Sequence, residues 1–232
     1  MFMIKNMIFD IGRVLIGFDW IEYMGILFDD ENTGMEISKA VWGSGLWKEL
    51  DRGVMPEEEV IAKIYECAGS YRSEMEKTLN NLPKCFTRKD YAIDWVRRLK
   101  ESGYKVYYLS NYSEFIRRSC PGILDFMQYM DGGVFSDEVK LLKPDPAIYE
   151  APLNKYGLNA SECIFTDDVQ ANVDAARALG FRAIRFDGYQ STYHVIMEYL
   201  SGSENGSEIA DLPLEGCPGD GKSFTEWGRK LH

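Results

Sequence analysis

Histidine and paired cysteine are scarce in this sequence of 232 residues. It contains two histidines, His194 and His232, and its five cysteines form no CxxC pair. So little histidine disfavours a histidine-rich zinc site and a Ser-His or Cys-His nucleophile. An odd number of scattered cysteines fits a reduced protein better than a disulfide framework. If the protein is an enzyme, we therefore expect its chemistry to rest on carboxylates, hydroxyls and lysines.

Positive charge and long apolar segments are also in short supply. The chain has 26 Lys and Arg against 37 Asp and Glu, a formal net charge of −11, which disfavours nucleic acids and anionic membranes as partners. No apolar run approaches the roughly 18 residues that span a bilayer. Lys5 and Asp10 interrupt the apolar N-terminus before a signal peptide could form. We expect a cytoplasmic protein, a monomer or small homo-oligomer, with no nucleic-acid or membrane partner.

The sequence nevertheless has enough apolar residues to fold. Hydrophobic residues make up 45% of the chain and aromatic residues 13%, which is above the range in which a chain stays disordered. The length predicts one large domain or one domain with an insertion. Short apolar runs alternate with amphipathic segments, and the runs are residues 7–9, 106–109, 133–136, 163–165 and 183–186. This alternation predicts an α/β fold with a doubly wound parallel sheet.

The segment after the first predicted strand has a different pattern. From residue 19 to about residue 82, apolar residues recur at helical spacing, and Pro56 is followed by three glutamates that suit a helix N-terminus. Later, Gly, Ser and Pro accumulate and the periodicity is lost. The sequence therefore predicts an α/β core of residues 1–17 and 85–200, an inserted all-helical domain of residues 18–84, and a C-terminal tail of residues 201–232.

Polar residues follow three of the predicted strands. Asp10 follows the first, Ser110 and Asn111 follow the second, and Asp167 and Asp168 follow the fourth. Each residue alone is most often a turn residue or a helix cap. Because the carboxyl ends of parallel strands share the edge of the sheet where ligands bind, we expect these groups to converge. Clustered carboxylates repel one another without a cation, so the arrangement predicts a divalent ion with oxygen ligands, most simply Mg²⁺.

Lys143 supplies a positive charge that such a site could use. Pro144 favours an extended backbone at Lys143, and Asp145 and Pro146 suit the cap and the first position of a following helix. Judged alone, this lysine is equally well explained as a solvated loop residue. Beside Asp10 and the acidic pair, it becomes a point charge for a phosphoryl group.

Four segments together resemble the haloacid dehalogenase (HAD) superfamily. In order along the chain they are Phe9-Asp10-Ile11-Gly12-Arg13-Val14-Leu15, Leu109-Ser110-Asn111, Lys143-Pro144-Asp145-Pro146, and Phe165-Thr166-Asp167-Asp168 with Asn172. The resemblance covers roughly residues 1–200, and the segment 18–84 is similar to the helical cap that one subfamily carries after its first motif. It implies a HAD-like Rossmannoid core with an inserted helical cap, and a phosphatase that acts on a small phosphate ester.

The resemblance also implies a mechanism and a set of site residues. Asp10 would attack phosphorus and form an acyl phosphate. Mg²⁺ would be held by Asp10, the Gly12 carbonyl and Asp168, with Asp167 as a further member or a support of the metal site. The groups that would bind or stabilise the phosphoryl oxygens are Ser110, the neighbouring Asn111, the backbone N–H groups of Ile11 and Gly12, and Lys143.

One position departs from the family pattern. The first motif usually has a second Asp two residues after the nucleophile, which protonates the leaving group and later activates water, and here that residue is Gly12. An acid–base group is worth roughly 10²–10⁴-fold in rate, so its task would pass to water, to the substrate or to a cap residue. The Asp-x-Gly variant resembles a branch that includes sugar-1-phosphate phosphatases, which makes a sugar phosphate the expected substrate.

Two other functions remain open on the sequence alone. A 2-haloacid dehalogenase shares the fold and the Asp nucleophile but needs no metal, and the pair Asp167 and Asp168 argues against it. A non-catalytic phosphometabolite-binding protein would keep the phosphate site without the acid–base Asp. Lys48 and Arg52, in a predicted helix of the insertion, are candidate substrate contacts, although long cationic side chains are more often solvated.

Overall fold

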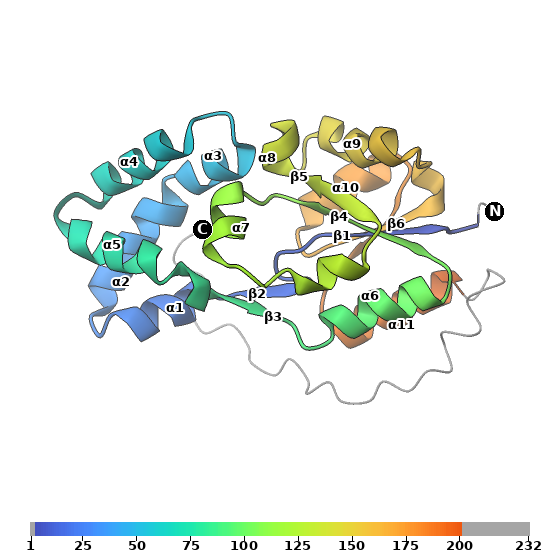
Figure 1. The fold of residues 1–232 in the computed structure, drawn as a ribbon, viewed down its shortest axis with the longest axis horizontal. Helices are drawn as coiled ribbons and strands as arrows, with labels where there is room; N and C mark the ends of the chain where they lie inside the picture. The colour runs from blue at the N-terminus through green and yellow to red at the C-terminus, as the bar shows by residue number, and fades with distance from the viewer. Residues whose placement is uncertain (1–2, 201–232) are drawn as a thin grey trace.

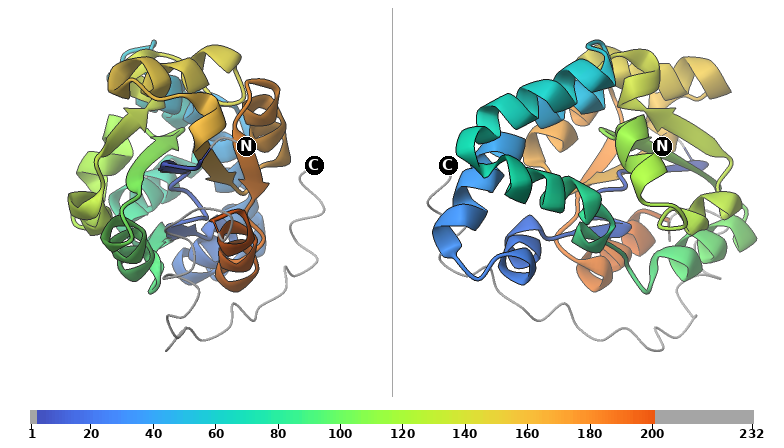
Figure 2. Two further views of the ribbon diagram at one scale, coloured as in Figure 1. Left: turned by 90° about the vertical axis from the view of Figure 1, so that its right-hand side faces the viewer. Right: turned by 60° about the vertical axis from the view of Figure 1, so that its left-hand side comes forward.

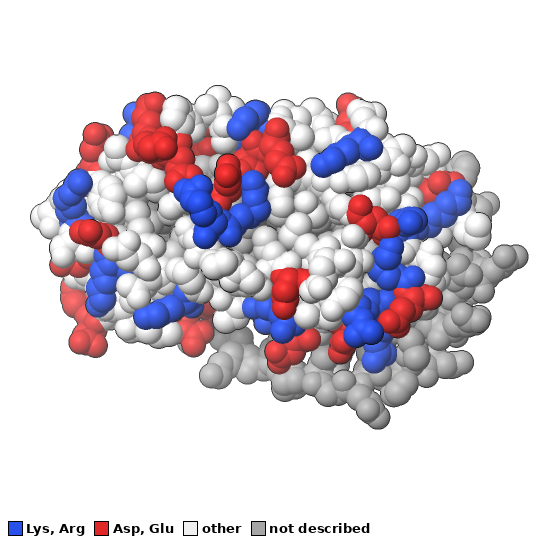
Figure 3. Space-filling model, in the orientation of Figure 1, with Lys and Arg blue, Asp and Glu red and all other residues white. Residues whose placement is uncertain are grey.

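The computed structural model of the chain describes residues 3–200. The tail expected at residues 201–232 lies outside the described residues. Figure 1 shows an α/β unit on the right that is joined to a group of helices on the left. On the face drawn in Figure 3, acidic and basic side chains are interspersed rather than gathered into one basic area. Among residues 3–200, none of the helices has the length and apolar character needed to cross a membrane.

A five-stranded parallel sheet forms the centre of the α/β unit. Its strands lie in the order β5-β4-β1-β6-β7, and every neighbouring pair is parallel. The strands are β1 (Asn6–Phe9), β4 (Lys105–Ser110), β5 (Gly132–Phe135), β6 (Cys163–Asp167) and β7 (Arg182–Arg185). The predicted α/β fold class with a parallel sheet is confirmed.

Helices cover both faces of this sheet (Figure 2). Helices α6 (Ala92–Glu101) and α11 (Tyr189–Leu200) pack on one face, and α9 (Pro146–Tyr156) and α10 (Gln170–Ala178) pack on the other. Shorter elements complete the unit, and they are α7 (Glu114–Ser119), η4 (Asp125–Tyr129), α8 (Ser136–Val139) and η5 (Ala160–Glu162). The sheet is therefore doubly wound, with a separate apolar core on each face.

Strand β1 lies in the middle of the sheet and is buried on both faces. Met7, Ile8 and Phe9 have no exposed surface. Met7 and Phe9 belong to the core that contains Trp95 of α6, whereas Ile8 belongs to the core that contains Tyr149 of α9. Successive side chains of a strand point to opposite faces. A strand buried on both faces therefore needs an uninterrupted apolar run, which is the pattern that the sequence shows.

Helix α9 begins as the sequence predicts. The Asp145 side chain accepts a hydrogen bond from the Ala147 N–H at 2.9 Å, and Pro146 is the first helical residue. Proline is favoured at this position because its fixed φ suits the helix and its missing N–H would have no partner there. This helix start anchors the chain directly after Lys143.

The helical insertion lies between two short strands, β2 (Ile16–Phe18) and β3 (Phe86–Arg88), which pair antiparallel. Its elements are α1 (Trp20–Leu27), α2 (Glu31–Ser38), the π-helix η1 (Lys39–Gly43), α3 (Leu46–Arg52), α4 (Glu57–Ala68), η2 (Gly69–Tyr71), α5 (Arg72–Asn80) and η3 (Leu82–Cys85). The sequence predicts the helices but not the strand pair, because strands of three residues are too short for a recognisable alternation. The pair holds the entry and the exit of the insertion side by side.

Helix α3 is the part of the insertion that packs near the carboxyl end of the sheet, against α7 and α8. The Ser136 hydroxyl donates to the Asp51 carbonyl at 2.5 Å, and Lys140 donates to the Gly53 carbonyl. Gly53 has a φ of +64°, and a Cβ there would lie 3.1 Å from the Asp137 Cα. Only glycine tolerates both this backbone conformation and this close approach. The end of α3 is therefore firmly attached to the α/β unit.

Candidate active site

The polar residues predicted at the strand ends come together around Lys143. The Lys143 ammonium lies 2.8 Å from Asp10 Oδ1 and 2.6 Å from Asp167 Oδ2. The Ser110 hydroxyl also donates to Asp10 Oδ1, at 2.7 Å. The side chains of Lys143 and Asp167 are almost fully buried, and that of Asp10 is 9% exposed. Residues from β4, β6, the turn after β1 and the loop before α9 thus form one buried network at the sheet edge.

The chain turns sharply after Asp10. The Ile11 carbonyl accepts hydrogen bonds from the Leu15 and Ile16 N–H groups at 2.9 and 3.0 Å. The Ile11 side chain is fully buried, so only the backbone of this residue is available near Asp10. At Gly12, an added Cβ would meet one atom, Asp10 Oδ2, at 3.9 Å. There is therefore room at position 12 for a side chain that the sequence does not provide.

Asp167 is hydrogen-bonded on both carboxylate oxygens. Oδ1 accepts from the Val169 N–H at 2.8 Å, and the Asn172 amide donates to both oxygens at 3.0 Å. With Lys143 on Oδ2, this carboxylate has a complete set of partners without any ligand. Its position and its bonds fix the lysine between Asp167 and Asp10.

Asn111 acts on the backbone of Lys143. The Lys143 N–H donates to Asn111 Oδ1 at 2.8 Å, and the Asn111 amide donates to the Lys143 carbonyl at 3.1 Å. These two bonds connect the loop after β4 to the loop that carries the lysine. The backbone on both sides of the site is thereby held in register.

Burial and charge shift the titration of the site residues. Burial raises the pKa of Asp10 to about 6, with Lys143 lowering it and the charges of Asp167 and Asp168 raising it. Burial lowers the pKa of Lys143, but Asp10 and Asp167 more than compensate, so the net shift is upward and the lysine stays charged. Burial, followed by the charge of Asp167, raises the pKa of Asp168, while Arg13 lowers it. A buried site that disfavours its own carboxylates in this way attracts a cation.

The donor set fits a hard divalent cation. One carboxylate oxygen from each of Asp10, Asp167 and Asp168 lies within 4.8 Å of the others. Asp168 is partly exposed, and its nearest cation, Arg13, is 4.0 Å away, so its carboxylate is free to turn to a metal ion. Oxygen ligands of this kind suit Mg²⁺, and the Gly12 carbonyl adds a further oxygen to the same turn.

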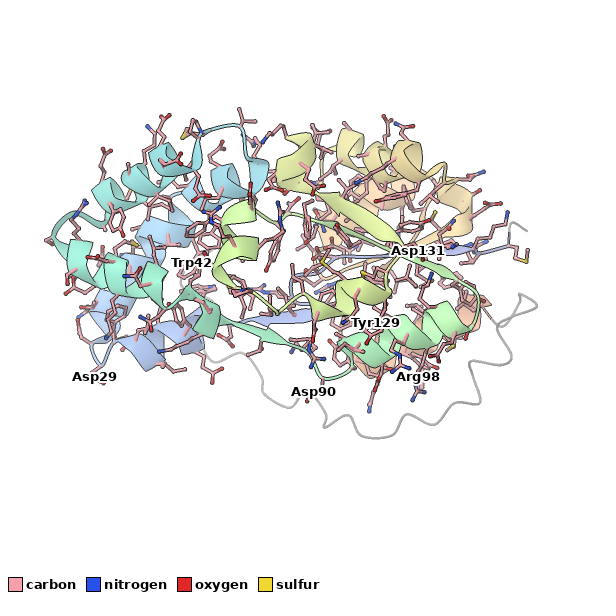
Figure 4. All side chains as sticks on the ribbon, in the orientation of Figure 1. Asp29, Trp42, Asp90, Arg98, Tyr129 and Asp131 are labelled. Atoms are coloured by element: carbon pink, nitrogen blue, oxygen red, sulfur yellow. The ribbon has the colours of Figure 1, made fainter. Side chains whose placement is uncertain are left out.

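The opposite end of the sheet shows how the same kind of residue is neutralised without a metal. Asp131, labelled in Figure 4, lies just before β5. Lys100 and Lys105 donate to its carboxylate at 2.6 and 3.1 Å. Burial raises the pKa of Asp131, but the hydrogen bonds from Lys100 and the Val106 N–H bring it below its ordinary value. At the Asp10 site, by contrast, two buried carboxylates share one buried lysine, and a third carboxylate, Asp168, lies beside them.

The two cationic residues that the sequence nominates in the insertion are not part of this network. Arg52 pairs with Glu49 at 2.9 Å and its side chain is 45% exposed, and Lys48 is also exposed. The sequence reading missed Asp51, which is 8% exposed. A signal was present, because Trp47, Leu50 and Asp51 follow the i, i+3, i+4 spacing of a buried helix face.

Comparison with known proteins places these features in a family. The family model described as haloacid dehalogenase-like hydrolase matches residues 42–180. The chain is 24% identical over 230 residues to a drimenol cyclase of Aspergillus calidoustus, covering 92% of this chain but only 42% of that protein. It is 25% identical over 194 residues to the D-ribitol-5-phosphate phosphatase of Bacteroides thetaiotaomicron, covering 79% of this chain and 92% of that enzyme.

A solved structure shows the same fold. It is a HAD family enzyme from Bacteroides thetaiotaomicron in complex with magnesium and inorganic phosphate, with a TM-score of 0.63 and 24% sequence identity. The match covers 82% of this chain and 98% of that chain.

Proposed function

The chain belongs to the haloacid dehalogenase-like hydrolase family, and on that premise we propose that it is a Mg²⁺-dependent phosphatase of a small phosphate ester. The observation that carries this proposal is the buried arrangement of Asp10, Ser110 and Lys143 beside Asp168. It combines a carboxylate nucleophile, a hydroxyl, a fixed positive charge and a further carboxylate at the ligand-binding edge of a parallel sheet. Phosphoryl transfer needs little else, because its catalysis is mostly positioning and charge stabilisation.

Asp10 is the nucleophile in this proposal. Its carboxylate attacks phosphorus in line and forms an acyl phosphate, which water then hydrolyses. Lys143, held 2.8 Å from Asp10 Oδ1, keeps the nucleophile ionised and offsets the charge of the phosphoryl oxygens. The Ser110 hydroxyl, now bonded to Asp10, turns to a phosphoryl oxygen when substrate is present.

The metal ligands in this proposal are Asp10, the Gly12 carbonyl and Asp168. Bound Mg²⁺ would supply positive charge that allows an anionic nucleophile to approach an anionic phosphate. We assign Asp167 the positioning of Lys143, because its oxygens already have partners from the protein.

The remaining residues of the site bind phosphate or position the groups that do. The N–H groups of Ile11 and Gly12 face the phosphoryl oxygens after the turn at Asp10. Asn111 acts through the two hydrogen bonds that it makes with the Lys143 backbone. Replacing Asn111 should therefore weaken phosphate binding indirectly, because the Lys143 backbone would lose these two hydrogen bonds.

The helical insertion is the expected source of specificity. We propose that residues 18–84 cover a core formed by residues 1–17 and 85–200, and that they contact the organic part of the substrate. The likeness to a D-ribitol-5-phosphate phosphatase supports a phosphorylated sugar or sugar alcohol as substrate. We also propose a cytoplasmic location, which is where such metabolites occur.

A release assay tests this function directly. The purified protein is incubated with a panel of sugar phosphates and with a 2-haloacid, with Mg²⁺ or with EDTA, and released phosphate and halide are measured. We expect Mg²⁺-dependent phosphate release that Asp10→Asn abolishes. Halide release without metal would identify a dehalogenase instead, and phosphate-ester binding without turnover would identify a non-catalytic binding protein.

A further inference from the structure

Building on the proposed phosphatase function, we propose that Asp51 of helix α3 is the general acid and base of the reaction. Asp51 would carry out the proton transfers that the family's second Asp performs at the position that is Gly12 here. The proposal rests on where the carboxyl group is held, on its missing hydrogen-bond partner, and on the charges around it.

The position of Asp51 is fixed from both sides. Within α3, Trp47, Leu50 and Asp51 are the buried residues, so Asp51 lies on the face that packs inward. The Ser136 hydroxyl donates to its carbonyl at 2.5 Å and is in turn the acceptor for the Tyr112 N–H at 2.9 Å. Ser136 thereby ties α3 to the loop that follows β4.

That loop also connects Asp51 to the nucleophile. Ser110, the last residue of β4 before that loop, donates to Asp10 at 2.7 Å. Three residues later, the Ser113 backbone N–H donates to the Asp51 carboxyl. The two carboxyl groups are therefore held by the two ends of one four-residue segment, one from the sheet and one from the insertion.

One oxygen of the Asp51 carboxyl has no partner. Within residues 3–200, Oδ1 is buried and makes no hydrogen bond. Water cannot easily replace the missing partner, because the whole residue is only 8% exposed. The nearby Tyr112 hydroxyl is also buried and has no partner in this part of the chain. Buried polar atoms are nearly always paired, so an exception of this kind calls for an explanation. A ligand that enters between α3 and the sheet edge would supply the missing partner.

Burial and the surrounding charges favour the protonated form of this carboxyl. Burial, then the charge of Asp137, raises the pKa of Asp51 well above its ordinary value; Asp10 adds to the shift and the Ser113 N–H opposes it. Asp137 of α8 is paired with Arg117 of α7 through two contacts of 2.9 Å, so that cation is already engaged.

Three other cations on or beside α3 are engaged elsewhere. Lys140 donates to the Gly53 carbonyl, Arg52 pairs with Glu49, and Arg118 of α7 pairs with Glu57 of α4. None of these pairs includes the Asp51 carboxyl. The environment of Asp51 therefore favours its neutral form, which has a proton to give.

In the proposed reaction, one proton passes from Asp51 to the leaving group and is restored to Asp51 by water. Asp10 attacks phosphorus, the bond from phosphorus to the ester oxygen breaks, and the ester oxygen takes the proton of Asp51 and leaves as the alcohol. Asp51 is now a carboxylate. A water molecule then attacks the acyl phosphate and gives its proton to Asp51, the bond from phosphorus to Asp10 breaks, and inorganic phosphate leaves. Both carboxyl groups return to their starting state.

The test compares two substrates of similar size that differ in leaving group. p-Nitrophenyl phosphate releases a weakly basic phenolate that needs no proton, whereas benzyl phosphate releases a strongly basic alkoxide. In Asp51→Asn, we expect benzyl phosphate hydrolysis to fall by roughly 10²–10⁴-fold. The first release of nitrophenolate should stay within about threefold of the unmodified protein, followed by slow turnover because water is no longer activated.

Controls separate this role from a structural one. Asparagine at position 51 keeps the shape of the side chain and an acceptor oxygen for the Ser113 N–H. The matched control is Glu49→Gln on the same helix, which should leave the rate of hydrolysis of both substrates unchanged. An equal loss with both substrates, or no loss with either, would overturn the role of Asp51 while leaving the phosphatase intact. If the unmodified protein hydrolyses neither compound with Mg²⁺, the proposed function fails and this inference fails with it.

A second variant guards against a folding defect. Gly12→Asp added to Asp51→Asn places a carboxyl group where the family usually has one, in space that meets only Asp10 Oδ2 at 3.9 Å. We expect benzyl phosphate hydrolysis to recover by at least about tenfold. A folded double variant, verified by its melting transition, that recovers nothing would count against the inference.

Discussion

Buried carboxyl groups at the sheet edge and in the helical insertion differ in their hydrogen bonding. At the sheet edge, Asp167 is paired on both oxygens and Asp10 is held by Ser110 and Lys143. In the insertion, one buried oxygen of Asp51 has no partner among the residues that the structure describes. The first arrangement is complete before substrate arrives, as a site for the constant phosphoryl group should be. The second leaves an oxygen available for the ester oxygen and the water molecule with which, in our proposal, Asp51 exchanges a proton.

Removing Lys143 should disrupt the paired carboxylates at the sheet edge and destabilise the protein. In Lys143→Met, the buried carboxylates of Asp10 and Asp167 lose their shared cation, which typically costs about 3–5 kcal/mol for a broken buried pair. Chemical denaturation should show this loss, together with loss of phosphate release. The control is Lys105→Met, because Lys105 belongs to the same sheet and pairs with Asp131 at the exposed end. An unchanged free energy of unfolding in Lys143→Met would contradict the pairing described here.

Mg²⁺ should bind at the sheet edge and not at Asp51 in the insertion. At a concentration about 100 times its dissociation constant, Mg²⁺ should stabilise the folded protein by about 2.7 kcal/mol. The stabilisation, measured by thermal melting, should disappear in Asp168→Asn and persist in Asp51→Asn. If the stabilisation persists in Asp168→Asn and disappears in Asp51→Asn, the metal binds near Asp51, which would contradict the proposed site at the sheet edge.

The smallest expected effect concerns the pH dependence of stability. The pKa of Asp51 is raised in the folded state, so the folded protein binds more protons than the unfolded chain at this residue. Its contribution to stability is therefore lost as pH rises from about 4, the unfolded value, through the folded value, by about 1.4 kcal/mol for each unit of difference.

Asp51→Asn removes that dependence. The difference in the free energy of unfolding between the variant and the unmodified protein should therefore shift in favour of the variant as pH rises across this interval. Asp10 and Asp168 also have raised pKa values, but they are present in both proteins and cancel in the comparison. A pH-independent difference would show that Asp51 titrates normally.

The sequence predicts the sheet edge well because each part of it has a local signal. A strand buried on both faces requires an apolar run such as Met7-Ile8-Phe9, and polar residues directly after such runs converge when the strands are parallel. The cap at Asp145 and the helix start at Pro146 are equally local. These signals are enough to bring Asp10, Ser110 and Lys143 together without coordinates.

The insertion is harder because its contacts join distant parts of the chain. The helical spacing shows that Asp51 faces inward, but not that it meets the Ser113 N–H or loses a partner for Oδ1. The pairing of β2 with β3 is also long-range and leaves no pattern in strands of three residues. Asn111 is similar, since its bonds to the Lys143 backbone depend on how two loops meet.

The central claim is that Asp10 accepts the phosphoryl group. The most direct measurement is rapid acid quenching of the protein during turnover of p-nitrophenyl phosphate with Mg²⁺, followed by peptide mass analysis. We expect one phosphoryl group on the peptide that contains Asp10, and we expect it to be absent in Asp10→Asn and absent with EDTA. Steady phosphate release with no phosphorylated peptide, or with the phosphoryl group on another residue, would contradict it.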